Sequence, residues 1–273
     1  MQRGPDHPEL DANDMLPDYA CRFVDVHCHC LPGLDDGPTS MVEAVALCET
    51  LAADNVGLVV ATPHQLGRFE SSTPAGEVRR TVERLNRALA ERGVNLRVLP
   101  GGEVRLDERI AELLARDEIL TLADMKRHVL VELPDEIFID AGPLFRELRS
   151  QGVEVVIAHP ERNLPLLRQP QILRRWLDRG ASLQVTAGSL TGCFGRDVKQ
   201  VAWELVARGW TVCVASDAHD RADGQSGLGM ASEMIATRLG TEVARLLCAE
   251  NPVRIVKGER PLSLLSRNRQ EVG

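Results

Sequence analysis

The chain alternates between short, mostly apolar runs and longer stretches in which hydrophobic residues recur every three or four positions. Apolar runs bounded by Gly, Pro and polar residues are typical of buried β-strands, and the periodic stretches are typical of amphipathic helices. Seven such runs occur along the chain. The predicted strands comprise residues 23–29, 57–64, 95–100, 128–133, 153–162, 182–190 and 211–220.

An amphipathic segment follows each of these strands. The first begins at Thr39 or Ser40, because either hydroxyl can cap a helix, and its apolar stripe includes Val45 and Leu51. The predicted helices comprise residues 40–54, 75–92, 107–116, 140–151, 170–179, 197–208 and 230–249. We expect Asn251 and the proline after it to begin a short C-terminal tail.

Seven strand-then-helix units joined by short connections predict parallel strands. Polar residues gather at the carboxyl ends of nearly every strand, which favours an α/β fold of the TIM-like barrel type, a distorted seven-stranded (β/α)7 barrel with its site at that end. A doubly wound open sheet is the alternative, but it would gather ligands at one switch point. We expect a flexible N-terminal arm at 1–21, a single barrel domain at 22–260 and a tail at 261–273.

Composition excludes several classes of protein. Of 273 residues 44% are hydrophobic and 26% are charged, which is typical of a globular chain. No apolar run approaches the roughly 18 residues that span a membrane, and the polar first twenty residues do not resemble a signal peptide. A net charge of −8 disfavours binding to nucleic acid. The charged helix at 75–92 is expected to be solvated, with homo-oligomer formation through it as the alternative.

Cysteine usage predicts a cytoplasmic location. The seven cysteines are an odd number and show no C-x-x-C spacing, as expected for reduced thiols. Cys28 and Cys30 flank His29, and we expect their side chains to face away from it as packing residues.

The first strand delivers the most informative residues. Alternate residues of a strand share a face, so Asp25, His27 and His29 are expected to point the same way. Two imidazoles side by side can hold one divalent metal ion. An isolated H-x-H pattern is weak evidence, because a pair of half-buried histidines is an equally ordinary interpretation.

The other predicted strands strengthen the metal hypothesis, because most of them also end in an imidazole or a carboxylate. Two histidines, His7 and His128, lie where the barrel places no site. The loop after the first strand offers Asp35 or Asp36, and spacing does not decide between them. The candidate ligands are His27, His29, Asp36, His64, Glu103, Glu132, His159, Asp217 and His219.

Nine nitrogen and oxygen ligands exceed the coordination of one ion, so two or three metal ions are predicted. Imidazole and carboxylate without thiolate suit Mn²⁺, Fe²⁺ or Zn²⁺. Metal ions about 3.5–4 Å apart can polarise a phosphoryl group and generate a nucleophile at neutral pH, so hydrolysis of a phosphoester is the predicted reaction. Arg162 and Arg68 lie on loops just after His159 and His64, where they could bind phosphate oxygens.

These motifs also carry a family likeness. The segments HCHCLPGLDDGP, ATPH, GGE, VEL, AHPER and SDAH, in this order, resemble the polymerase and histidinol phosphatase (PHP) superfamily. Within it they are most similar to the bacterial manganese-dependent protein-tyrosine phosphatases of capsule and exopolysaccharide loci. The likeness runs from Phe23 to Pro252. It implies the seven-stranded PHP barrel and a trinuclear metal centre.

The resemblance also implies a distribution of the ligands. The first metal would be held by His27, His29, Glu103 and Asp217. Glu103 would bridge to a second metal, also held by Glu132 and His159. The third would take Asp36, His64 and His219. Arg162 matches an arginine expected to bind phosphate. Gln225 stands where a second such arginine is expected, and Arg221 nearby is a substitute.

The resemblance implies a phosphotyrosine protein as substrate, namely the tail of a bacterial tyrosine kinase that controls capsule or exopolysaccharide synthesis. A histidinol-phosphate phosphatase, or another small-molecule phosphatase of the superfamily, is the enzymatic alternative. Such enzymes usually carry histidine where Asp36 and Glu132 stand here, so these carboxylates favour the tyrosine phosphatase. A non-catalytic metal-binding module is a second alternative, which the complete ligand set disfavours.

Overall fold

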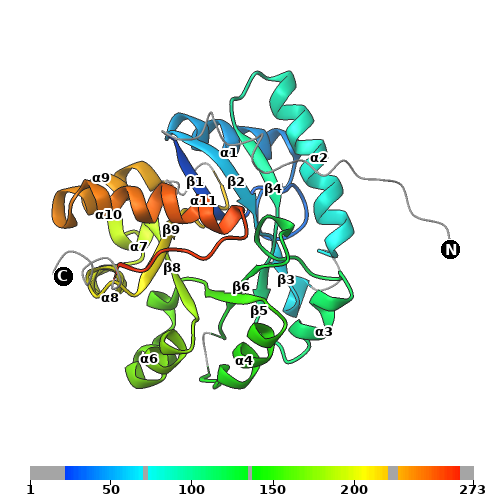
Figure 1. Ribbon diagram of the computed structural model, residues 1–273. Helices are drawn as coiled ribbons and strands as arrows, with labels where there is room; N and C mark the ends of the chain where they lie inside the picture. The colour runs from blue at the N-terminus through cyan, green and yellow to red at the C-terminus, as the bar shows by residue number, and fades with distance from the viewer. Residues whose placement is uncertain (1–21, 70–72, 135–136, 221–226, 265–273) are drawn as a thin grey trace.

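The computed structural model describes residues 22–69, 73–134, 137–220 and 227–264 (Figure 1). The predicted arm at 1–21 and most of the predicted tail therefore lie outside the described residues. Within the described ranges, no helix combines the length and the hydrophobicity that crossing a membrane requires.

The first strand, helix and strand match their predicted positions. Strand β1 (Phe23–Cys28) is followed by helix α1 (Met41–Ala53) and strand β2 (Val56–Ala61), which pairs in parallel with β1. Ser40 caps α1, because its side chain accepts a hydrogen bond from the backbone N–H of Glu43. The carboxylate of Glu43 in turn accepts from the backbone N–H of Thr39 at 2.7 Å, so two groups that the helix leaves unpaired are satisfied.

Two of the predicted strands are interrupted. The second strand breaks at Pro63, which has no N–H to donate, and resumes as β3 (His64–Gln65). The third is divided into β4 (Arg97–Pro100) and β5 (Glu103–Arg105). Gly102 permits this step, because a Cβ there would lie 2.1 Å from the side-chain oxygen of Gln65. The interruption divides the strands into two parallel sheets, ordered β1-β2-β4 and β3-β5-β6-β7-β8-β9.

The remaining strands run in chain order through the larger sheet. Its other strands are β6 (His128–Glu132), β7 (Glu154–Ile157), β8 (Ser182–Thr186) and β9 (Thr211–Ala215), and all of their pairings are parallel. The α/β parallel architecture is confirmed. The prediction for 182–190 was too long, because the chain turns after Thr186 into the short helix α7 (Ala187–Thr191).

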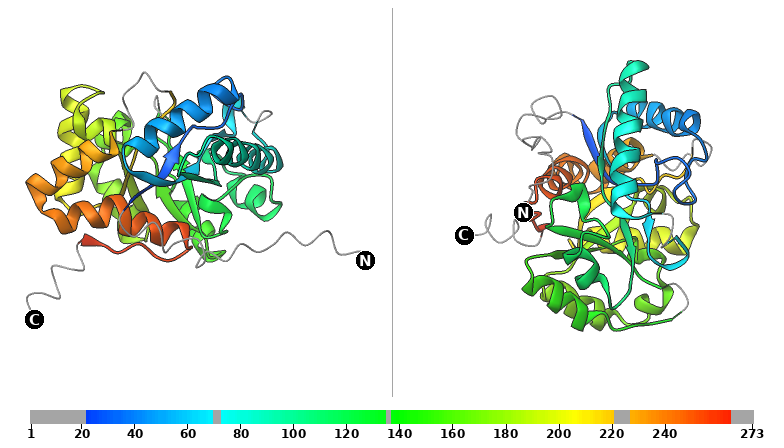
Figure 2. Two further views of the ribbon diagram at one scale, coloured as in Figure 1. Left: turned by 90° about the horizontal axis from the view of Figure 1, so that it is seen from above. Right: turned by 90° about the vertical axis from the view of Figure 1, so that its right-hand side faces the viewer.

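Helices lie on the outer side of the strands in each view (Figures 1 and 2). They include α2 (Ala75–Glu91), α3 (Ile110–Ala115), α4 (Gly142–Ser150), α6 (Pro170–Asp178) and α8 (Arg196–Ala207). The connections between the strands also contain the short helix α5 (Leu164–Leu167) and the 3₁₀ turns η2 (Gly67–Phe69), η3 (Leu122–Asp124) and η4 (Pro160–Arg162).

The last strand meets the first one. Cys28 and Ala218 form a parallel bridge, and the backbone N–H of Asp217 donates to the carbonyl of His27 at 2.8 Å. The N–H of His29 donates to the carbonyl of Ala218 at 2.9 Å. These contacts bring the carboxyl ends of β1 and β9 together, although they lie in separate sheets.

Two hydrophobic clusters occupy the two faces of the strands. One joins helix residues such as Leu47 and Leu148 to strand residues such as Val59. The other contains the alternate strand residues, such as Val60, together with Ile255 near the C-terminus. Because adjacent residues of β2 belong to different clusters, both faces of the strand are buried, as expected for parallel strands covered by helices. Cys28 and Cys30 belong to the first cluster, which confirms them as packing residues.

The C-terminal region differs from its prediction. Instead of one helix at 230–249, the chain forms α9 (Leu228–Leu239), α10 (Thr241–Arg245), a π-helical turn (Leu246–Glu250) and α11 (Asn251–Val256). The predicted tail at Asn251 was wrong. Asn251 is fully buried, donates to the carbonyls of Val212 and Leu262, and accepts from the N–H of Leu262. Its partners hold the C-terminal segment against β9.

Replacing Asn251 by alanine should lower the free energy of unfolding by about 2–4 kcal/mol, because it leaves buried backbone groups without partners. Urea unfolding of the metal-free protein would measure this. Gln200→Ala is the control, since the exposed Gln200 side chain donates to Glu204 on the same helix, and it should change stability by less than about 0.5 kcal/mol. An unchanged midpoint for Asn251→Ala would contradict the anchoring role.

Candidate metal centre

Eight of the nine candidate ligands come together at the carboxyl ends of the strands. They form three overlapping groups, and within each group the ligand atoms lie within 4.8 Å of one another. The first group is His27, His29 and Asp217; the second is His27, Glu103 and His159; the third is His29, Asp36, His64 and His219.

His27 of β1 and His29, which follows β1 directly, face each other. The Nδ1 atom of His27 lies 2.9 Å from the side-chain oxygen of Gln184, and Nδ1 of His29 lies 2.7 Å from a carboxylate oxygen of Asp35. Both partners are acceptors, so each Nδ1 carries a hydrogen and each neutral ring presents the lone pair of Nε2. The two Nε2 atoms are 3.2 Å apart. Two lone pairs at this distance repel unless a cation lies beside them.

Two carboxylates face the same point. Oδ1 of Asp217 lies 3.2 Å from Nε2 of His27, and Oε2 of Glu103 lies 3.4 Å from it. Oε2 of Glu103 is buried and has no hydrogen-bond partner. A buried charge in this state is costly without a counter-ion. The converging lone pairs and the unpartnered carboxylate oxygen therefore fit a bound metal ion, and the imidazole and carboxylate donors suit Mn²⁺, Fe²⁺ or Zn²⁺.

The third group lies nearer the surface. Oδ1 of Asp36 is 3.4 Å from Nε2 of both His64 and His219. Asp35 has a different role, because its carboxylate accepts from His29 and from the backbone N–H groups of Gly37 and His64. Asp35 thus orients a candidate ligand, and Asp36 is the loop carboxylate that reaches the metal-binding group.

The pKa values of these groups reflect their crowding. Burial disfavours charged His27, but Glu103 and Asp217 together outweigh it and raise the pKa above the ordinary value. Burial opposes charge on His29 also, where Asp35 is the first of the carboxylates that outweigh it and raise the pKa well above its usual range. Burial would raise the pKa of Asp35, but charged His29 brings it down to about 2. In the absence of metal, protons therefore stay on His27 and His29 up to a higher pH than on a free imidazole.

Two candidate ligands have unusual backbone geometry. His159 has a φ of 30° and Asp217 a φ of 55°, both in the left-handed region that few residues other than glycine adopt. These conformations turn each side chain at the point where its strand ends. Nε2 of His159 then lies 2.8 Å from Oε1 of Glu103, whose other oxygen faces His27. Such strain is common at functional sites.

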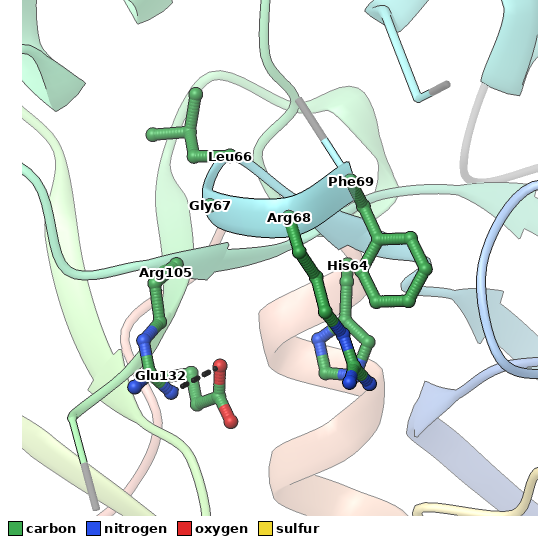
Figure 3. A pocket seen from close by; sticks show the side chains of 7 residues that line it. All are labelled: His64, Leu66, Gly67, Arg68, Phe69, Arg105 and Glu132. Atoms are coloured by element: carbon green, nitrogen blue, oxygen red, sulfur yellow. Dashed lines mark ion pairs between the residues drawn. The ribbon is translucent and has the colours of Figure 1, made fainter. Parts of the chain in front are cut away.

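Glu132 is the candidate ligand outside the three groups. Its Oε2 atom lies 3.0 Å from Nη1 of Arg105, and Figure 3 shows this ion pair. Glu132 nevertheless lines the same cavity of about 280 Å³ as Glu103 and His159. The cavity places it at the entrance to the candidate metal centre.

The two candidate phosphate-binding arginines of the described residues form ion pairs with candidate metal ligands. Arg162 pairs with Asp217, lines the cavity and lies 4.8 Å from the ring centroid of Phe194. Arg68 pairs with Asp36 at 2.7 Å. Arg221 lies outside the described residues, and so does Gln225.

The sequence analysis missed the role of Gln184 in β8. Its side-chain oxygen accepts hydrogen bonds from both Nδ1 of His27, at 2.9 Å, and the backbone N–H of His159, at 3.3 Å. A glutamine inside a strand that is otherwise buried was the available signal. Asp25, which was expected to share a face with His27 and His29, lies outside the three metal-binding groups. Asp25 instead accepts hydrogen bonds from Ser216, and burial raises its pKa to about 6.

Comparison with known proteins adds independent findings. The family model described as "Capsular polysaccharide synthesis, CpsB/CapC" matches residues 23–257. Tyrosine-protein phosphatase YwqE of Bacillus subtilis is 36% identical over 199 residues, covering 72% of this chain and 78% of YwqE. Tyrosine-protein phosphatase CpsB of Streptococcus pneumoniae is 28% identical over 243 residues, covering 86% of this chain and 98% of CpsB.

Solved structures agree with these relatives. One from a study of YwqE and CpsB, described as unique metal-dependent tyrosine phosphatases, superposes with a TM-score of 0.82 at 31% identity, covering 88% of this chain and 96% of the other. The phosphotriesterase homology protein of Escherichia coli superposes with a TM-score of 0.55 at 13% identity, covering 86% of this chain and 98% of the other. The second likeness shows a shared fold alone.

Gln184→Leu should weaken metal binding by about tenfold to a hundredfold, because His27 loses the acceptor that fixes its ring and tautomer. Isothermal titration with Mn²⁺ measures the affinity. The exposed Gln151 supplies a matched control, Gln151→Leu, which should bind as the wild type does. Wild-type affinity in Gln184→Leu would mean that another contact sets the orientation of His27.

Metal binding should release protons and strengthen as the pH rises. The raised pKa values of His27 and His29 mean that protons compete with the metal up to a higher pH than at free imidazole. Affinity is therefore weakest below these pKa values. Calorimetry in two buffers of different ionisation enthalpy counts the released protons, and identical heats in both buffers would contradict the competition.

Proposed function

We propose that this chain, which belongs to the CpsB/CapC family of capsular polysaccharide synthesis proteins, is a metal-dependent phosphatase. The proposed reaction is the hydrolysis of phosphotyrosine in proteins. The relatives named tyrosine-protein phosphatases cover most of the chain, which supports the activity. The observation that carries the proposal is the convergence of His27, His29, Glu103 and Asp217 on one point, with Arg162 lining the same cavity. A metal site beside a guanidinium group suits a phosphate ester.

We assign the ligands as the resemblance implies. One metal is held by His27, His29, Glu103 and Asp217; a second by Glu103, Glu132 and His159; a third by Asp36, His64 and His219. The groupings of the described residues support this, with Glu103 between His27 and His159. For Glu132, the support is its place in the same cavity. Mn²⁺ is our choice of metal, with Fe²⁺ or Zn²⁺ accepted by the same donors.

The bound metal ions would supply Lewis acidity and an activated nucleophile. The protein side chains prepare the site for the substrate. Arg162 extends from η4 into the cavity, where its planar guanidinium can bind two phosphate oxygens. Phe194 and Asp217 hold that guanidinium in place from two sides. Asp35 and Gln184 fix the rings of His29 and His27, so these ligands need little reorganisation when substrate arrives.

We further propose a cytoplasmic location and, as the protein partner, a bacterial tyrosine kinase that controls capsule or exopolysaccharide synthesis. The names of the relatives and the family support the second point, and the free thiols of buried cysteines such as Cys48 and Cys213 suit the first. Self-association through the charged face of α2 remains an accompanying hypothesis.

Substitution of His159 by alanine should lower phosphatase activity at least about a hundredfold while the protein stays folded, since even residues that only orient metal ligands cost up to that amount. Turnover of p-nitrophenyl phosphate with added Mn²⁺ measures the loss, and a chelator should abolish wild-type turnover. His128→Gln is the matched control, because His128 is buried at the amino end of β6, away from the site. Full activity of His159→Ala would refute its assignment as a ligand.

The same assay separates the alternatives. A phosphotyrosine peptide should be a better substrate than histidinol phosphate. The reverse order would favour a small-molecule phosphatase of the PHP superfamily. Metal binding without any turnover would favour a non-catalytic metal-binding module.

A further inference from the structure

A second cavity adjoins the candidate metal centre. It has a volume of about 470 Å³ and shares His64 and Glu132 with the cavity that holds Arg162. Its remaining walls include Arg68 and Phe69 of η2 and Arg105 of β5 (Figure 3). A substrate whose phosphate lies at the candidate metal centre can therefore reach this cavity with its neighbouring groups.

Figure 3 shows that the side chains of Arg68 and Arg105 extend from the backbone in the same direction, the direction in which Glu132 and His64 lie. Arg105 pairs with Glu132 at 3.0 Å, and its Nη1 atom lies 3.4 Å from the carbonyl of Leu133. Arg68 pairs with Asp36 at 2.7 Å. Two guanidinium groups therefore lie at this cavity, each paired with one carboxylate.

Both arginine partners are carboxylates that we assign to metals. Asp36 uses one oxygen for Arg68, while its other oxygen faces His64 and His219. When metals are bound, the negative charge of Asp36 and Glu132 is shared between the metal ions and the arginines. These carboxylates then neutralise Arg68 and Arg105 only in part. Both guanidinium groups retain the capacity to bind an anion from the substrate.

Arg68 is positioned in advance although its side chain is 75% exposed. Its guanidinium carbon lies 4.6 Å from the ring centroid of Phe69, and that ring stacks on His64 with centroids 5.4 Å apart. Cation–π contact of this kind restricts a long side chain at little cost. Phe69 thus connects the cavity wall to a candidate metal ligand.

We propose that this cavity is an anion subsite in which Arg105 and Arg68 bind a second acidic group of the same substrate. This inference rests on the proposed function. The group is a carboxylate of a flanking Asp or Glu, or a second phosphate on a neighbouring residue, since both offer the paired oxygens that a guanidinium recognises. Arg105 is then a specificity-determining residue, and acidic or doubly phosphorylated segments are the preferred substrates.

The test compares phosphotyrosine peptides of equal length. One peptide is neutral around the phosphotyrosine, a set carries one Asp at successive positions on either side, and a further set carries a second phosphotyrosine instead. The wild type should prefer the best anionic peptide over the neutral one by about fivefold in kcat/KM, the effect expected of a partly exposed charge pair. In Arg105→Gln this preference should fall to about one, and Arg105→Lys should restore part of it.

The informative quantity is the ratio of kcat/KM for the best anionic peptide to kcat/KM for the neutral peptide. If Arg105→Gln only disturbs Glu132 and the metal, both peptides decline together and the wild-type ratio persists, which would overturn the proposal. A wild type with no preference at any position would overturn it as well. Arg116→Gln is the matched control, because Arg116 pairs with Glu112 on α3 and does not line the cavity; it should keep the wild-type ratio.

A binding measurement separates this inference from the proposed function. Fluorescence anisotropy with peptides that carry phosphonodifluoromethyl-phenylalanine, a non-hydrolysable analogue, should show the same loss of preference in Arg105→Gln. If the wild type hydrolyses no phosphotyrosine peptide, the proposed function fails while the anisotropy still reports on the subsite. Response to the second phosphate alone identifies a phosphate subsite, whereas response to Asp as well identifies a general anion subsite.

Discussion

The structure depends on a buried cluster of imidazole nitrogens and carboxylate oxygens that all present electron pairs to one point. The Nε2 atoms of His27 and His29 lie 3.2 Å apart, with Glu103 and Asp217 directed at the same point. Such a group is unfavourable in a protein interior unless a cation joins it, so the fold holds together a site that a metal completes. Gln184 and Asp35 hold the rings of His27 and His29 in place in this arrangement.

The strands keep one register across their breaks. Ala61 of β2 pairs with Pro100 of β4, and three residues further along His64 of β3 pairs with Glu103 of β5. Candidate ligands from neighbouring strands therefore lie side by side beyond Pro63. In this way a parallel α/β architecture gathers imidazoles and carboxylates from separate strands into one centre.

Charge around the centre is arranged in pairs. Arg162, Arg68 and Arg105 each contact a carboxylate that also belongs to the candidate metal centre or its entrance. Three guanidinium groups therefore lie among the carboxylates at the end of the strands where an anionic substrate would meet the candidate metal centre.

The sequence alone determined the parallel strand-helix order and the candidate ligands, because apolar periodicity and polar residues at strand ends are local signals. It did not reveal the breaks at Pro63 and Gly102, which depend on packing against Gln65 and neighbouring strands. It also left Asp35 and Asp36 undecided. Only the tertiary structure separated them, since hydrogen bonds from His29, Gly37 and His64 occupy Asp35 and leave Asp36 facing the cluster. Contacts between residues far apart along the chain produce no hydrophobic periodicity in the sequence. The contacts of Gln184 with His27 and of Arg105 with Glu132 could therefore be identified only in the fold.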